Sequence, residues 1–128
     1  MAELTKAKRI LVVDDDPVII KLVETRLRAK GYEVMTSSEA PSGLEKALKQ
    51  KPDLVILDVM MPIVNGYNFC RLLKTQEEFK KIPVVLLTSR AGGEDRKIGE
   101  EVGANAYLTK PFDMDDLQAK IKELLHLA

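Results

Sequence analysis

Histidine and cysteine, the side chains behind much nucleophilic and metal chemistry, are almost missing from this sequence. The chain of 128 residues has one cysteine, Cys70, and one histidine, His126. A single cysteine excludes an internal disulfide and a thiolate zinc site. One histidine, two residues from the end, argues against a Ser-His-Asp or Cys-His catalytic site and against a multi-histidine metal site. Cys70 lies between Phe69 and Leu73 at helical spacing, so we expect it to pack in the core.

Long apolar segments and an excess of charge are also missing. The longest apolar runs, such as residues 84–87, are far shorter than the ~18 residues of a membrane span. The N-terminus carries no apolar signal segment, which predicts a cytoplasmic protein with no membrane partner. Twenty basic and twenty acidic side chains cancel, and no DNA-binding segment follows the last predicted helix. We therefore expect no direct DNA binding, because nucleic-acid binding usually rests on a basic surface.

Five short apolar runs, each ending at polar residues, dominate what the sequence does contain. They are rich in β-branched residues and continuously apolar, which is typical of strands buried on both faces of a parallel sheet. The predicted strands cover residues 9–13, 32–36, 54–57, 83–87 and 106–109.

Helical patterns separate these strands. Asp16 and Pro17 are expected to cap and begin the first helix, in which Val18, Leu22, Val23 and Leu27 recur at helical spacing up to Gly31. A second helix opens at Ser38 or Glu39 and places Leu44, Ala47 and Leu48 on one face. A third carries Phe69, Leu72 and Leu73, and a fourth, polar helix covers residues 94–102. Asp113 begins the fifth, with Leu117, Ile121, Leu124 and Leu125 facing inward.

Strands that alternate with helices predict an α/β fold with helices on both faces of a parallel sheet. Five strands favour the flavodoxin-like, doubly wound arrangement with strand order 2-1-3-4-5 and five helices. At 128 residues the chain is expected to form a single domain, with its core at about residues 8–125.

The ligand of such a sheet binds outside the carboxyl ends of its strands. The polar residues predicted at those ends are Asp14 and Asp15, Asp58, Thr88 and Lys110. The first and third strands are neighbours in this order, which brings the three carboxylates into one pocket. Two carboxylates ~4 Å apart repel by about 4 kcal/mol at an effective dielectric constant of 20. A cation among them relieves this repulsion, and an all-oxygen ligand set suits Mg²⁺.

A metal-bridged phosphoryl group on a carboxylate fits this pocket better than a nucleotide does. The glycine-rich loop that cradles nucleotide phosphates is absent. Carboxylates serve as nucleophiles in aspartyl-phosphate chemistry. Lys110 is expected to neutralise one phosphoryl oxygen and Thr88 to donate a hydrogen bond to another.

Four segments together resemble the response-regulator receiver domains of two-component signalling. They are Ile-Leu-Val-Val-Asp-Asp at 10–15, Pro-Asp-Leu-Val-Ile-Leu-Asp at 52–58 followed by Met61-Pro62 and Gly66, Leu-Leu-Thr-Ser at 86–89, and Tyr-Leu-Thr-Lys-Pro-Phe at 107–112. The resemblance extends from about Lys8 to Leu125. Within the family, the chain resembles the single-domain chemotaxis receivers.

The resemblance implies a role for each residue of the pocket. Asp58 would be the phosphoacceptor. Asp14, Asp15 and Asp58, with the backbone carbonyl of Met60, would hold Mg²⁺. Thr88 and Tyr107 would form a switch pair, Lys110 would contact the phosphoryl group, and the Lys110–Pro111 peptide bond would be cis.

It also implies partners and a mode of action. A sensor histidine kinase or phosphotransfer protein would donate the phosphoryl group, and an unknown downstream protein would read the result. The chain would act as a switch, and not as an enzyme beyond catalysing its own phosphorylation and dephosphorylation. The readout is expected on the fourth helix, fifth strand and fifth helix, and a phosphorylation-dependent homodimer would be one form of it. Met60 and Arg90, the family's variable positions, would flank the route of the hydrolytic water.

Two other classes remain as alternatives. A haloacid-dehalogenase-like phosphatase also uses an aspartate and Mg²⁺, but it needs an Asp-x-Asp loop and an inserted cap, and here a helix follows residues 14–16 directly. A flavin-binding module of the same fold needs aromatic stacking residues, and none of the six aromatic residues is near Asp14. The sequence leaves open whether this domain comes from a longer regulator or hybrid kinase.

Overall fold

A single parallel sheet forms the centre of the molecule. The computed structural model describes residues 7–58, 66–77, 80–88 and 103–125. Its strands are β1 (Arg9–Val13), β2 (Glu33–Ser37), β3 (Leu54–Asp58), β4 (Val84–Thr88) and β5 (Ala106–Thr109). All four neighbouring pairs are parallel, and the order across the sheet is β2-β1-β3-β4-β5. The predicted flavodoxin-like strand order is confirmed.

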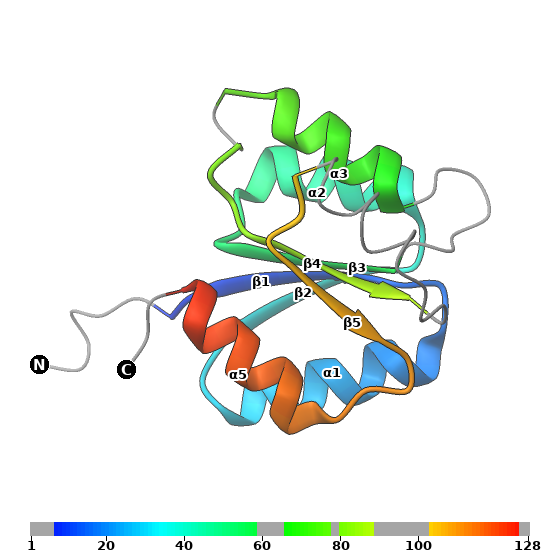
Figure 1. Ribbon diagram of the computed structural model, residues 1–128, viewed down its shortest axis with the longest axis vertical. Coiled ribbons are helices and arrows are strands. Elements are labelled where there is room, and N and C mark those ends of the chain that lie inside the picture. Colours follow the sequence, from blue (N-terminus) through cyan, green and yellow to red (C-terminus); the bar gives the residue numbers. More distant parts are fainter. Residues whose placement is uncertain (1–6, 59–65, 78–79, 89–102, 126–128) are drawn as a thin grey trace, which may run out of the picture.

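Helices cover both faces of this sheet. The described helices are α1 (Pro17–Ala29), α2 (Ala40–Gln50), α3 (Gly66–Thr75) and α5 (Met114–Leu124). In Figure 1, α2 and α3 lie on one face and α1 and α5 on the other. The helix predicted over 94–102 lies outside the described residues, so the doubly wound arrangement is seen here with four of its five expected helices.

Successive residues of the strands alternate between two apolar layers, as the pleat of a strand requires. On the face of α2 and α3, Leu11, Val55 and Leu86 pack with Ala47 and Leu73. The facing layer joins the strands to α1 and α5, and its buried members include Ile10, Ile56, Leu87, Leu27 and Leu117. Because the inner strands are buried on both faces, their sequences are continuously apolar.

Local capping fixes where two helices begin. The Asp16 side chain accepts a hydrogen bond from the Val18 amide at 2.9 Å, and Pro17 occupies the first turn of α1. Asp113 caps α5 in the same way through the Asp115 amide, at 2.8 Å. The cap by Asp16 was predicted from the sequence, as was the start of the last helix at Asp113. At the start of α2 the capping residue is Glu39, whose side chain makes no capping hydrogen bond.

Some apolar side chains of the predicted helical patterns lie at the surface. Val18 is 71% exposed, and Leu22, Leu48 and Leu72 are each at least 40% exposed. The neighbouring Val23, Leu27, Ala47 and Leu73 are buried instead. These helices therefore bury a narrower stripe than their apolar residues suggest.

Several expected features lie outside the described part of the chain. They are the loop over 59–65 with Met60, residue Arg90, the C-terminal His126 and the side chain of Cys70. None of the described helices has the length and apolar character that a membrane crossing requires.

Candidate functional site

Four polar residues gather where the strands end. Asp14 follows β1, Asp58 and Thr88 are the last residues of β3 and β4, and Lys110 follows β5. Asp14, Asp58 and Thr88 are buried, with at most 4% of each residue exposed. The parallel register explains the convergence. The strands β1, β3, β4 and β5 are consecutive neighbours, and their carboxyl ends lie at the same end of the sheet.

The three predicted metal-binding carboxylates lie together. Asp14, Asp15 and Asp58 each offer a carboxylate oxygen, and these oxygens lie within 4.8 Å of one another. Asp15 is exposed, whereas the other two are buried. The cluster therefore runs from the interior to solvent, which gives a ligand a way in. Met60, the fourth predicted ligand, lies outside the described residues.

Lys110 is the cation of this cluster among the described residues. Its Nζ lies 2.8 Å from Asp14 Oδ2 and 3.6 Å from Asp58 Oδ2. Burial by itself lowers the pKa of Lys110, but the hydrogen bond and attraction to Asp14, with a further contribution from Asp58, raise it above its ordinary value. Lys110 stays protonated. The cluster has three carboxylates and, among the described residues, one ammonium, so the site keeps an acidic excess.

Backbone contacts fix the position of Asp14. Its amide donates to the Ser37 carbonyl at 3.1 Å, beyond the last residue of β1. Its Oδ1 accepts from the Asp16 amide at 2.9 Å, and its Oδ2 faces Lys110. Sequence reasoning gave Asp16 only a capping role and gave Ser37 none. An aspartate at the end of a strand is the signal for the contact between Asp14 and the Asp16 amide, because aspartate side chains accept hydrogen bonds from amides two residues ahead.

The predicted switch residues occupy neighbouring strands. Thr88 pairs in register with Thr109, and its carbonyl accepts from the Lys110 amide at 2.5 Å. Tyr107 pairs with Leu86 and is partly buried against the apolar layer beneath α2 and α3. The Lys110–Pro111 peptide bond is cis, as the resemblance implied.

The donor set indicates which ion this site can hold. Its candidate ligands are carboxylate oxygens, with no imidazole or thiolate among the described residues of the cluster. Oxygen ligands suit hard cations, and Mg²⁺ in particular uses one or two carboxylates together with phosphate oxygens and water. Two of the carboxylates are already held near Lys110, so a divalent cation would balance the remaining charge.

Comparison with known proteins agrees with this geometry. Residues 10–122 match the family described as the response regulator receiver domain. The chain is 40% identical over 118 residues to the alkaline phosphatase synthesis transcriptional regulatory protein PhoP of Bacillus subtilis, covering 92% of this chain and 48% of PhoP. This chain therefore spans about half the length of that relative.

Solved structures give the same result. The chemotaxis protein CheY4 of Vibrio cholerae superposes with a TM-score of 0.89 at 33% identity, covering 93% of this chain and 99% of CheY4. The receiver domain of the sensor histidine kinase PA1611 from Pseudomonas aeruginosa reaches a TM-score of 0.86 at 30% identity, with 94% and 99% covered. That structure holds a magnesium ion coordinated in its active-site cleft.

Proposed function

This chain belongs to the family of response regulator receiver domains, and from that premise we propose that it is a signalling switch phosphorylated on Asp58. The observation that carries the proposal is the acidic cluster of Asp14, Asp15 and Asp58, two of whose carboxylates are buried, with Lys110 Nζ beside it. Burying like charges is unfavourable for folding alone, so the arrangement favours a ligand that brings positive charge and phosphate.

Asp58 is the proposed nucleophile. An oxygen of its carboxylate attacks the phosphorus of the donor, forming an acyl phosphate. The bond from phosphorus to the donor breaks, and the leaving group departs with the electron pair. For a phosphohistidine this leaving group is the imidazole nitrogen of a partner kinase or phosphotransfer protein. The chain's only histidine is His126, which agrees with a donor on another protein.

Lys110 and Thr88 have proposed roles around the transferred group. Lys110 Nζ lies 3.6 Å from Asp58 Oδ2, near enough to reach an oxygen of a phosphoryl group on that carboxylate. A charge-assisted hydrogen bond of this kind is roughly twice as strong as a neutral one. Thr88 ends the strand next to β3 and would donate its hydroxyl to another phosphoryl oxygen.

Mg²⁺ is the proposed cofactor, held by Asp14, Asp15 and Asp58 with the Met60 carbonyl. When bound, it would neutralise the negative charge of the carboxylates and of the phosphoryl oxygens. Hydrogen bonds to Ser37 and Asp16 already hold Asp14 in place at this site.

The output is proposed to be conformational. Thr88 would move toward the phosphoryl group and Tyr107 would fill the space it leaves, altering the surface expected for the predicted helix over 94–102, β5 and α5. A downstream protein, or a second phosphorylated copy, would bind this surface. In this role the chain turns over no external substrate, and it works in the cytoplasm.

The test uses a small phosphodonor. The chain is incubated with acetyl phosphate, with and without Mg²⁺, and its intact mass is measured. We expect a gain of one phosphoryl group only when Mg²⁺ is present. No gain under any condition would overturn the proposal, and repeated release of phosphate from a phosphomonoester would favour a phosphatase instead.

A further inference from the structure

The outer side of β2 is an open edge of the sheet. Among the strands that the structure describes, β2 pairs only with β1, which lies on its inner side. The Glu33 amide bonds to the Lys8 carbonyl at 2.9 Å, and the Ser37 carbonyl accepts from Asp14 at 3.1 Å. Because backbone groups alternate in direction along a strand, Val34 and Thr36 turn their N–H and C=O groups away from β1.

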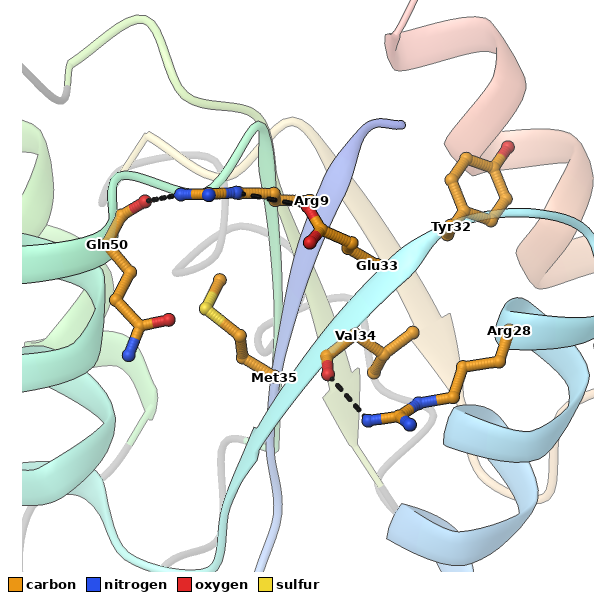
Figure 2. A pocket seen from close by; sticks show the side chains of 7 residues that line it. All are labelled: Arg9, Arg28, Tyr32, Glu33, Val34, Met35 and Gln50. Atoms are coloured by element: carbon orange, nitrogen blue, oxygen red, sulfur yellow. Dashed lines mark hydrogen bonds and ion pairs between the residues drawn. The ribbon is translucent and has the colours of Figure 1, made fainter. Parts of the chain in front are cut away.

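Two cationic side chains occupy the outward carbonyls. Arg28 Nη2 donates to the Val34 carbonyl at 3.1 Å, and Lys46 Nζ donates to the Thr36 carbonyl. Arg28 comes from α1 and Lys46 from α2, so the edge is bracketed from both faces of the sheet. Figure 2 shows Arg28 reaching along the strand to Val34.

Arg28 is suited to stay in this position. Arg28 also pairs with Glu24, one turn back along α1, at 3.1 Å. Its side chain is 58% exposed, so the guanidinium remains hydrated while it bonds to the strand. A long stem with a charged head can cover an apolar surface without burying its charge.

Space remains beside the strand. A cavity of about 330 Å³ lies along the start of β2, lined by Val34 and Met35 of the strand and by Arg28 of α1. Figure 2 shows these side chains around it, with Arg9 bridging Glu33 and the Gln50 carbonyl at its border. Within the described residues no strand covers β2 here. The two cations, and not another strand, are what occupy its outward carbonyls.

We propose that Arg28 and Lys46 close the edge of β2 against pairing with β2 of a second copy of this chain. Open edges with free backbone groups are templates for pairing with another chain, and charged side chains are one means of blocking them. The outward groups of β2 are self-complementary, since two antiparallel copies would place Val34 opposite Thr36 twice. Each such pair exchanges two backbone hydrogen bonds, and the assembly closes with two-fold symmetry.

This closure has a consequence for signalling. Pairing through β2 would be independent of phosphorylation, because β2 lies at the opposite edge of the sheet from β5. If the β2 edge is blocked, two copies of the chain can associate only through other surfaces, which phosphorylation can alter. The inference itself rests on the backbone contacts of β2 and does not require Asp58 to be phosphorylated.

The test compares two double variants with the same loss of charge. Arg28→Ala/Lys46→Ala removes both blocking side chains. Arg26→Ala/Lys49→Ala removes one exposed cation from each of the same two helices and leaves β2 untouched. Sedimentation equilibrium is run over a concentration series on unphosphorylated protein. We expect the first variant to self-associate at concentrations at which the wild-type chain and the second variant remain monomeric.

Amide hydrogen exchange locates the interface. In the associated variant the Val34 and Thr36 amides should exchange at least about tenfold more slowly than in the control, because each gains an acceptor. Arg28→Lys/Lys46→Arg keeps a donor at each carbonyl and should stay monomeric. Absence of association in Arg28→Ala/Lys46→Ala, or association without slower exchange at these two amides, would overturn the proposal.

Circular dichroism checks that each variant is folded. If the double alanine variant does not fold, the single variants Arg28→Ala and Lys46→Ala carry the test, since each frees one carbonyl. Weaker self-association than that expected of the double variant, with slower exchange at the same amides, would support the proposal. Two folded single variants that remain monomeric would overturn it.

Discussion

The two ends of the strands differ in the burial and the pairing of their charged side chains. At the carboxyl end, Asp14 and Asp58 are buried and face a single ammonium, that of Lys110, within the described residues. At the amino end, Arg9 pairs with Glu33 at 3.2 Å, and both side chains are at least half exposed. One end concentrates charge of one sign in the interior, and the other neutralises its charges at the surface.

The amino-end charges have local structural partners. The Arg9 amide donates to Asp53 Oδ2, and the Asp53 amide donates to the Arg9 carbonyl, both at 2.8 Å. Lys74 Nζ joins the Ile82 carbonyl to Asn105 Oδ1, which also accepts from the Val84 amide. These contacts satisfy backbone groups where strands begin. At the carboxyl end there are more carboxylates than are needed to accept hydrogen bonds from the backbone. The additional carboxylates indicate a binding site.

The largest difference between the two ends is expected when one carboxylate at each end is replaced by an amide. Asp58→Asn should abolish phosphorylation by acetyl phosphate, because the amide is not a nucleophile for this transfer. Asp53→Asn makes the same chemical change at the amino end and should be phosphorylated at the wild-type rate. Intact mass spectrometry measures both. Equal labelling of the two variants would show that the acceptor is elsewhere.

The second prediction compares the ion pairs of the two ends. Lys110→Met leaves Asp14 and Asp58 facing each other without the ammonium, and removing one partner of a buried pair costs about 3 kcal/mol or more. Arg9→Met breaks an exposed pair and should cost about 1 kcal/mol or less. Urea unfolding in the presence of a chelator measures both free energies of unfolding.

Added Mg²⁺ should affect the stability of these two variants differently. It should restore part of the stability of Lys110→Met, because the ion supplies positive charge to the same carboxylates. It should leave Arg9→Met unchanged. Equal losses for the two variants, or no effect of Mg²⁺ on either, would contradict the assigned difference between the ends.

How far the sequence alone leads can be judged from these same residues. Asp58 and Thr88 could be placed because each follows an uninterrupted apolar run, and the strand order then made them neighbours. The closer approach of Lys110 to Asp14 than to Asp58 could not be foreseen, since it depends on the path of the chain after β5. Sequence periodicity also overstated the burial of α1, since Val18 and Leu22 follow the helical pattern but are 71% and 40% exposed.

The roles of Arg28 and Lys46 were hidden for a different reason. Both occur in helices whose polar residues are typical of a solvated surface, and nothing in their spacing refers to β2. Their contacts with Val34 and Thr36 appear only once the helices are packed against the edge strand. Long-range contacts of flexible side chains have no local sequence signal, unlike the cap formed by Asp16.

The third prediction concerns the exposed member of the acidic cluster. Asp15→Ala should lower the apparent affinity for Mg²⁺ in the phosphorylation reaction by roughly tenfold or more. A tenfold loss is equivalent to about 1.4 kcal/mol of ion binding. Asp116→Ala, which removes an exposed carboxylate from α5, is the control. Initial rates over a series of Mg²⁺ concentrations give the apparent affinity. A variant that is phosphorylated at the wild-type rate in a chelator would rule out this role for Asp15.

The smallest effect is expected on the lifetime of the phosphorylated state. Met60 lies two residues after the acceptor and offers no polar group to orient a water molecule, and Arg90 is long enough to cover the acyl phosphate. Met60→Asn should therefore hydrolyse a few-fold faster than the wild-type chain. Leu72→Asn, at an exposed position of α3, should leave the rate unchanged. Equal decay of all three proteins would remove the argument.

Asp58 is the one residue that we expect to carry the phosphoryl group. Borohydride reduces an aspartyl phosphate to homoserine and leaves a free carboxylate intact, so peptide mass mapping after reduction identifies the acceptor. After incubation with acetyl phosphate and Mg²⁺, we predict homoserine at position 58 alone. Homoserine at position 14 or 15, or at any aspartate of the amino end, would show that Asp58 is not the phosphoacceptor.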